Sequence, residues 1–221
     1  TSTNMDAAQT EVSESTRTAT FTPGRDAARK EASKLNVPRI GVRFRLPASM
    51  NQVEYFGRGP AENYLDRNAG SMVGLYKSTA EELYFPYVRP QENGHHTDTR
   101  WVSLSTGKKG LLIQADNTIG FNALRNSIED FDDEEATGLS RQWSNFTPEQ
   151  VANHDEAAAK NVLRRQHHIN DITPRDFVEV CVDLKQQGVA GYDSWGSRPE
   201  PAYTLPANRE YNWGFTLIPL K

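Results

Sequence analysis

The stretch "RIGVRFRL" (residues 39–46) alternates between two kinds of side chain. The apolar residues at every second position are Ile40, Val42, Phe44 and Leu46. The arginines on the opposite series are Arg39, Arg43 and Arg45. Because successive side chains of a strand point to opposite faces, this period of two predicts a β-strand with one apolar and one charged face.

The same period returns twice further along the chain. In "DFVEVCVDL" (176–184) the apolar series is Val178, Val180, Val182 and Leu184. The residues that alternate with it are Glu179, Cys181 and Asp183. In "YNWGFTL" (211–217) one side carries Tyr211, Trp213, Phe215 and Leu217. Both stretches therefore predict strands.

Turn signals join these patterns into a fold class. "WVSLST" (101–106) and "GLLIQAD" (110–116) flank "GKKG", which predicts a β-hairpin. "TRTATFT" (16–22) alternates as well and is a candidate additional strand. Strands this frequent, separated by glycine and proline turns, favour an all-β fold, an antiparallel β-sandwich.

The chain divides into a polar N-terminal segment, residues 1–36, and a sandwich domain, residues 37–221. The segment is expected to be partly extended or connecting. One helix is predicted over residues 147–168, because Thr147 suits the N-cap, Pro148 the first helical position and Gln150 the third. Residues 129–138, "EDFDDEEATG", are expected to form a charged loop.

Composition excludes several classes of function. The 221 residues carry a net charge of −4 and no basic stripe, so we expect no nucleic-acid partner. No apolar run approaches the roughly 18 residues of a membrane span. The single cysteine, Cys181, excludes an intrachain disulfide, and it fits either the cytoplasm or the periplasm of a bacterium. The polar opening without a targeting signal suggests a piece of a longer protein.

The histidine pairs are poor candidates for a metal site. His95-His96 and His167-His168 are adjacent in sequence, and adjacent strand residues point to opposite faces. We therefore expect no metal site and assign both pairs to ordinary polar loops. "DFDDEE" lacks the ligand spacing and central glycine of a calcium loop.

Four carboxylates have the residue type that glycosidases use in pairs: Glu62, Glu92, Asp98 and Asp193. In glycine- and proline-rich turns such groups more often accept backbone N–H bonds, so we expect no catalytic residue among them. "GRGPAENY" (57–64) has only two of the three glycines of a nucleotide-binding loop, and we expect no phosphate site there.

Five stretches together resemble a known family. They are "VPRIGVRFRLP" (37–47), "VEYFGRGPAENYLDR" (53–67), "VGLYKSTAEELY" (73–84), "YFPYVRPQENGHHTDTRW" (84–101) and "GYDSWG" (191–196). In this order they are similar to the C-terminal domain, or small chain, of bacterial β-galactosidases of glycoside hydrolase family 2. The likeness fades between residues 120 and 170.

The resemblance implies a sandwich of the galactose mutarotase type, often called a supersandwich. It implies a parent enzyme that hydrolyses terminal β-galactosides with two glutamates on a (β/α)8 barrel, which are absent from this chain. The parent would use magnesium and sodium ions, with no cofactor or metal held by this chain. The expected partners are a β-galactoside or galactose and the catalytic barrel.

The resemblance also assigns residue roles. Trp195 of "DSW" would offer its ring to the sugar, with Asp193 and Tyr192 beside it, and Tyr192 stands where the family usually has an acidic residue. A tryptophan face suits the C–H groups of a sugar ring, and Gly191 and Gly196 would let the loop turn sharply. The residues expected to be structural are Gly57, Arg58, Gly59, Pro60, Glu62, Asn63, Tyr64, Pro90, Glu92, Asn93 and Gly94.

Two alternatives stay open at this point. One is a stand-alone carbohydrate-binding module. The other is an aldose epimerase, whose general acid and base would be His95 or His96 with Glu92.

Overall fold

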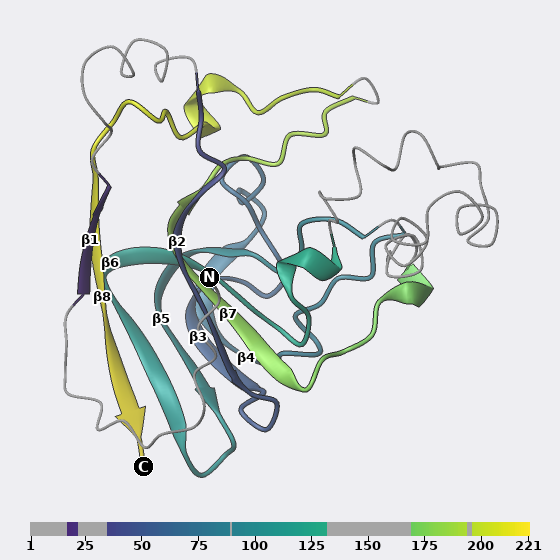
Figure 1. Ribbon diagram of the computed structural model, residues 1–221, viewed down its shortest axis with the longest axis vertical. Coiled ribbons are helices and arrows are strands. Elements are labelled where there is room, and N and C mark those ends of the chain that lie inside the picture. The colour runs from purple at the N-terminus through teal and green to yellow at the C-terminus, as the bar shows by residue number, and fades with distance from the viewer. Residues whose placement is uncertain (1–16, 22–34, 89, 132–168, 194–195) are drawn as a thin grey trace, which may run out of the picture.

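The computed structural model describes residues 17–21, 35–88, 90–131, 169–193 and 196–221, and this part of the chain is almost entirely β-structure (Figure 1). The strands are β1 (Arg17–Phe21), β2 (Arg39–Pro47), β3 (Gln52–Gly59), β4 (Met72–Thr79), β5 (His96–Ser105), β6 (Gly110–Leu124), β7 (Phe177–Gln186) and β8 (Tyr211–Leu220). Three short 3₁₀ turns join them: η1 (Ile128–Asp130), η2 (Ile169–Asp171) and η3 (Pro201–Tyr203). No helix in these ranges is long and apolar enough to cross a membrane.

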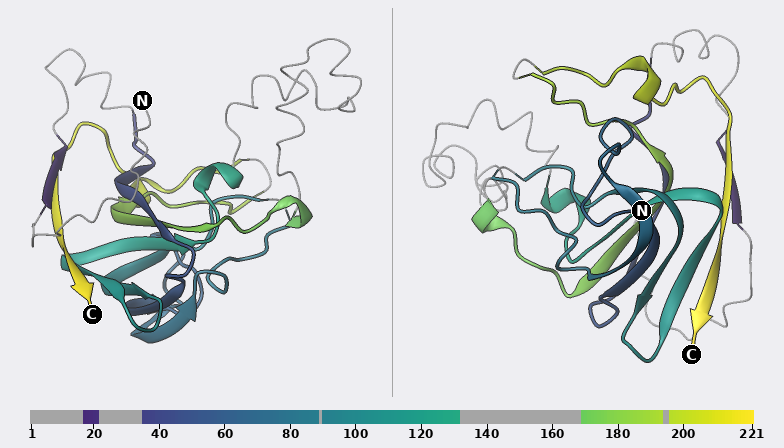
Figure 2. Two further views of the ribbon diagram at one scale, coloured as in Figure 1. Left: turned by 60° about the horizontal axis from the view of Figure 1, so that its bottom comes forward. Right: turned by 180° about the vertical axis from the view of Figure 1, so that it is seen from behind.

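All eight strands belong to one antiparallel sheet that divides along β6. The main path runs β1-β8-β6-β5-β3-β4. The first part of β6 pairs with β8 from Gly110 to Ala115, and the last part pairs with β7 from Gly120 to Leu124. Strand β7 then pairs with β2. Figures 1 and 2 show β2 and β7 passing over the other layer, so the sheet folds into a two-layer sandwich.

The core lies between these two layers. One layer supplies Val53 and Tyr55 from β3, Val102 and Leu104 from β5, and Ile113 from β6. The other supplies Val178, Val180 and Val182 from β7, with Phe44 and Leu46 of β2 packed against them. The all-β sandwich predicted from the sequence is confirmed, as are the 101–116 hairpin and the strand near residue 17.

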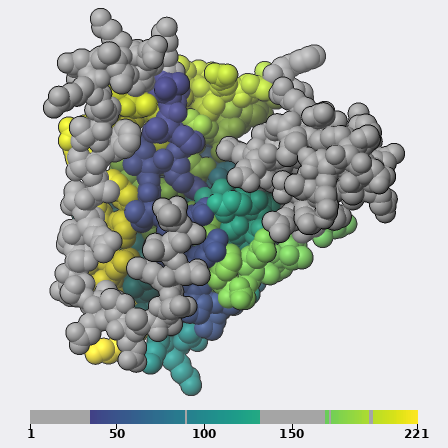
Figure 3. All heavy atoms as spheres, viewed as in Figure 1, coloured from purple at the N-terminus to yellow at the C-terminus, as the bar shows by residue number. Residues whose placement is uncertain are grey.

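The two charged faces predicted for separate strands meet in the structure. Arg45 of β2 stands opposite Glu179 of β7, and Arg43 stands opposite Cys181. Glu179, Cys181 and Asp183 are buried like the valines between them, so β7 is covered on both faces. Arg43 and Arg45 are half-exposed beside them. In Figure 3 the chain around β2, in dark blue, forms part of the visible surface. Arg43 and Arg45 thus neutralise the Glu179 carboxylate, and Arg39 pairs with Asp183, so the core can hold both groups.

The apolar face of β2 is only partly buried. Phe44 and Leu46 pack against the core, whereas Val42 keeps 39% of its surface exposed. The alternation predicted the strand correctly but overstated how much of that face the second layer covers.

The expectation that His95 and His96 lie in ordinary polar loops is wrong, because both side chains are fully buried. They do point to opposite sides. The His96 ring stacks on Phe121, 5.0 Å between centroids, and its two nitrogens lie 3.1 and 3.2 Å from the carbonyl oxygens of Gly94 and Pro60. Burial lowers the pKa of His96, so the neutral ring has one N–H, and that N–H has a carbonyl acceptor in either tautomer, which is why a polar residue is tolerated there.

The start of the predicted charged loop is also more ordered than expected. Residues 128–130 form η1, and the buried Asp130 accepts a hydrogen bond from Arg175 Nε at 3.0 Å. Residues 132–138 of that loop, the helix predicted over 147–168 and the pair His167-His168 lie outside the described residues.

Replacing Glu179 with alanine is expected to lower the free energy of unfolding by about 1–3 kcal/mol. The change strips a buried acceptor from Ile128 N, 3.0 Å away, and from Arg45 Nε, also 3.0 Å away. Urea unfolding measures the loss. The control is Glu54→Ala, whose exposed ion pair with Lys77 is worth less than about 1 kcal/mol. Equal effects of the two variants would contradict the account of the buried face.

Candidate functional site

Three of the sequence motifs meet around one surface groove of about 590 Å³. Tyr64 and Arg67 line it from the turn after β3, and Gln91 and Glu92 from the segment before β5. The remaining wall is the segment from Gln186 to Gly191, with Pro38 and Pro199 at its borders. Residues far apart in sequence are therefore brought together by the fold.

The turn after β3 is organised by Asn63. Gly57, Arg58 and Gly59 end the strand and Pro60 follows it. The buried Asn63 side chain donates to the carbonyls of Arg58 and Ala61 at 3.1 Å each, and its oxygen accepts from Thr97 N at 3.0 Å. One amide therefore closes the turn and ties it to β5.

Glu62 joins this turn to the next motif. Its carboxylate accepts from Gly94 N at 2.7 Å, from Arg67 Nη2 at 3.1 Å and from the Tyr64 hydroxyl at 3.3 Å, and the Tyr87 hydroxyl donates to it as well. These are the turn-stabilising contacts expected of such a carboxylate. The Tyr64 ring lies between the His95 ring and the Arg67 guanidinium, and burial raises its pKa.

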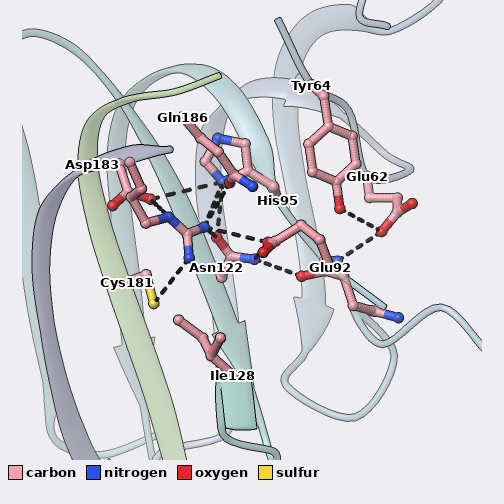
Figure 4. A network of polar contacts seen from close by, with 12 residues as sticks. Glu62, Tyr64, Glu92, His95, Asn122, Ile128, Cys181, Asp183 and Gln186 are labelled. Atoms are coloured by element: carbon pink, nitrogen blue, oxygen red, sulfur yellow. Dashed lines mark hydrogen bonds and ion pairs between the residues drawn. The ribbon is translucent and has the colours of Figure 1, made fainter. Parts of the chain in front are cut away.

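The segment before β5 has an asparagine of its own. Asn93 accepts from Phe85 N at 2.9 Å and donates to Phe85 O at 2.5 Å, which closes the loop that contains the buried Pro90. Gly94 follows with φ +70°, and a Cβ atom there would lie 2.8 Å from Leu124. Both features fix where Glu92 lies. Its side chain points toward Asn122 (Figure 4), and its Oε1 lies 3.4 Å from Arg39 Nη2.

Arg39 is the centre of a polar network beneath the groove, and its partners Glu92, Asn122, Asp183 and Gln186 are labelled in Figure 4. Its Nη2 donates to Asn122 Oδ1 and Gln186 Oε1 at 2.7 Å each and reaches Glu92 at 3.4 Å. Its Nε lies 3.0 Å from Asp183 Oδ2, but the N–H is not directed at that oxygen, so this contact is an ion pair without a hydrogen bond.

Burial controls protonation in this network. It raises the pKa of Asp183 to about 7, against the opposing effect of Arg39. It lowers the pKa of His95 to about 3, and Arg39 adds to that effect. It raises the pKa of the Cys181 thiol to about 12. His95 is thus a neutral ring held at 2.8 Å from Asn122 Oδ1, and Cys181 is no nucleophile near neutral pH.

These observations weigh against an aldose epimerase. Its acid and base would have to touch the sugar, whereas His95 and His96 are both sealed inside the fold. Neither histidine belongs to the lining of the groove.

The third motif is held in place by Asp66. Its carboxylate accepts from Val189 N at 3.1 Å and from Ala190 N at 2.7 Å, and the Tyr192 hydroxyl lies 3.4 Å from it. A Cβ atom on Gly188 would lie 2.5 Å from this carboxylate, so the backbone passes directly over it. The turn-after-β3 motif therefore anchors the segment that leads to "GYDSWG".

The described part of "GYDSWG" is a sharp, exposed loop. Gly191 and Gly196 have φ values of +83° and +81°, which non-glycine residues rarely adopt. Asp193 Oδ1 accepts from Ser197 N at 3.3 Å, and Tyr192 is 57% exposed. Ser194 and Trp195 lie outside the described residues, so the role of Trp195 stays a prediction.

Sequence reasoning missed Asp66 and Asn122 as site residues. Asp66 lies within the 53–67 block, but nothing near it in sequence reveals a partner more than 120 residues away. Among the described residues, no group of three or more histidine, cysteine, aspartate or glutamate side chains is arranged to hold a metal ion.

The antiparallel sandwich with a loop-lined polar groove places the chain among the β-sandwich domains. Comparison with protein families gives a more specific assignment than the fold. The family model of the β-galactosidase small chain matches residues 3–217, and this chain belongs to that family.

Curated relatives agree with this assignment. The chain is 35% identical over 185 residues to a β-galactosidase of Priestia megaterium (strain DSM 319 / IMG 1521), covering 83% of this chain and 15% of that protein. It is 40% identical over 111 residues to a β-galactosidase of Arthrobacter sp. (strain B7), covering 48% of this chain and 11% of that protein. It is 29% identical over 181 residues to a β-galactosidase of Vibrio cholerae, covering 82% of this chain and 14% of that protein. The chain thus spans about 15% of the first of these relatives.

Replacing Asp66 with alanine is expected to speed amide hydrogen exchange at Val189 and Ala190 by roughly tenfold, because both N–H groups lose their acceptor. NMR-detected exchange measures it. Asp116→Ala, at an exposed position of β6, is the control and should leave both amides protected. Unchanged protection in the Asp66 variant would show that the loop is held by other contacts.

Proposed function

We propose that this chain is the non-catalytic C-terminal sandwich domain of a glycoside hydrolase family 2 β-galactosidase, which hydrolyses terminal β-galactosides with retention. The catalytic glutamates would lie on the barrel of the remaining polypeptide, together with any magnesium and sodium ions. This domain would contribute the loop 191–196 to the sugar site. The family match and the coverage of only 15% of a full-length relative support a domain of a longer enzyme.

The observation that carries the loop's role is its anchorage. A loop that presents an aromatic ring to a ligand must be fixed in advance, since otherwise binding has to order it. Asp66 holds the residues before the loop, and Asp193 with Ser197 closes it. A tryptophan carried on such a loop would cover the C–H face of a galactose ring, with Tyr192 and Asp193 beside it.

A second feature fits a domain that docks on a larger body. Strand β4 ends the main path of the sheet, and its register places Leu75 opposite Phe56 of β3. Leu75 is 59% exposed, Phe56 38%, and Val73 and Met72 are exposed nearby. An exposed apolar strand at a sheet edge invites unwanted pairing unless something covers it. The proposed cover is the remaining part of the β-galactosidase polypeptide.

A stand-alone carbohydrate-binding module would explain the loop and the groove but not this apolar edge. The matched relatives are long enzymes of which this chain covers a small fraction. We therefore favour the domain of a larger enzyme.

In the full-length parent enzyme, Trp195→Ala is expected to raise KM roughly ten- to hundredfold with a smaller change in kcat. The lost contact is a partly buried aromatic one, worth on the order of 1–3 kcal/mol in ground-state binding. Steady-state kinetics with a chromogenic β-galactoside measure it. The result that overturns the role is an unchanged KM with lowered thermal stability, which belongs to a tryptophan of the core.

Leu75→Lys is expected to leave the melting temperature of this chain nearly unchanged, because the side chain is already 59% exposed. In the whole enzyme the same change should lower the temperature of thermal inactivation, since it would place a charge in an apolar contact. The matched control is Leu35→Lys, at a side chain 61% exposed and outside the β3–β4 edge. If both variants inactivate at the same temperature as the unaltered enzyme, the apolar edge is not the docking surface.

A further inference from the structure

We propose that the groove between the three motif segments is itself a binding site for a neutral saccharide residue. The inference goes beyond the proposed function, because it requires neither Trp195 nor the rest of the enzyme. It rests on the chemistry of the groove lining and on polar atoms there that the fold leaves without partners.

The charged groups of the lining balance each other. Among the described residues, Arg67 and Glu92 are its one cation and one anion. The other polar side chains are the Tyr64 hydroxyl, which donates to Glu62, and the amides of Gln91, Gln186 and Gln187. An anionic ligand would meet Glu92 and a cationic one Arg67. An apolar ligand would leave the amides without hydrogen bonds. A neutral molecule with many hydroxyl groups fits both constraints.

Glutamine and carboxylate side chains can form hydrogen bonds to the neighbouring hydroxyl groups of a sugar ring. An amide offers an acceptor and two donors, and each sugar hydroxyl is a donor and an acceptor. Pro38, Val189 and Pro199 add apolar surface at the border, where the C–H groups of a pyranose can pack. The volume of about 590 Å³ lies within the usual range of small-molecule sites, about 300–1,000 Å³.

Several of these groups have hydrogen-bonding capacity to spare. Gln186 is buried, and its oxygen accepts from Arg39 at 2.7 Å, which leaves its NH₂ group without a partner in the described part of the chain. The second carboxylate oxygen of Glu92 is free within the same ranges, and so are the whole side-chain amides of Gln91 and Gln187. Polar groups held in place by the fold but not used by it are typical of a binding site.

The groove walls are also fixed in advance. Arg39 holds Gln186 and Glu92 from below, and the N–H of Gln187 donates to Pro38 O at 2.9 Å. Asp66 holds the segment from Val189. Little ordering entropy is therefore lost when a ligand enters, although a groove open to water gives only weak, millimolar affinity.

The test is an NMR titration of ¹⁵N-labelled chain with methyl β-D-galactoside and methyl β-D-glucoside, with glycylglycine as a ligand of another class. We expect saturation transfer to the sugars and shifts of the side-chain amide signals of Gln91 and Gln187. Glycylglycine should give neither. The double variant Gln91→Ala/Gln187→Ala should bind sugar roughly tenfold more weakly, because it removes two recognition groups.

Matched variants make the outcome decisive. Neither replaced side chain makes a hydrogen bond or an ion pair within the described residues, so the double variant should melt at nearly the same temperature as the unaltered chain. Gln114→Ala, on the exposed face of β6, is the control and should bind sugar normally. Absence of saturation transfer, or equal affinity in the double variant, overturns the groove site. Loss of binding in Trp195→Ala alone would place the sugar on the loop, in which case the proposed function survives and the groove site fails.

Discussion

The fold depends on one largely buried guanidinium, that of Arg39. A charge removed from water must be matched on nearly every side, and Arg39 is matched by four groups from three segments: Asp183 and Gln186 on β7, Asn122 on β6 and Glu92 before β5. These are also the places where the sheet divides and the second layer begins. The requirement to satisfy Arg39 therefore fixes how β2, β6 and β7 cross.

The site follows from that arrangement in two steps. Arg39 holds Glu92 and Gln186 at the floor of the groove, and Glu62 connects the Glu92 segment to the turn after β3 through Gly94. That turn continues to Asp66, whose carboxylate holds the backbone before the "GYDSWG" loop. A chain of buried polar contacts thus runs from the core to the exposed loop proposed to meet the sugar.

The sequence predicted strands correctly where only one face of the strand is buried. Alternation in 39–46, 101–116 and 211–217 predicted strands that the structure contains, because one face of each meets the core. It was less informative about β7, where both faces are buried, and about His95 and His96, whose carbonyl and amide partners come from distant segments. Asp66 shows the same limit, since its role depends on backbone groups more than 120 residues away. Local sequence patterns do not predict contacts with partners so far away in the chain.

The most direct test of the central claim is a structure of the whole β-galactosidase with galactose bound. The account predicts that the loop 191–196 lies against the sugar, with Asp66 still holding the backbone at residues 189 and 190. The two carboxylates that flank the reacting carbon should come from outside this chain, about 5–5.5 Å apart as retention requires. A bound sugar with this loop remote from it, or with a carboxylate of this chain at the reacting carbon, would contradict the account.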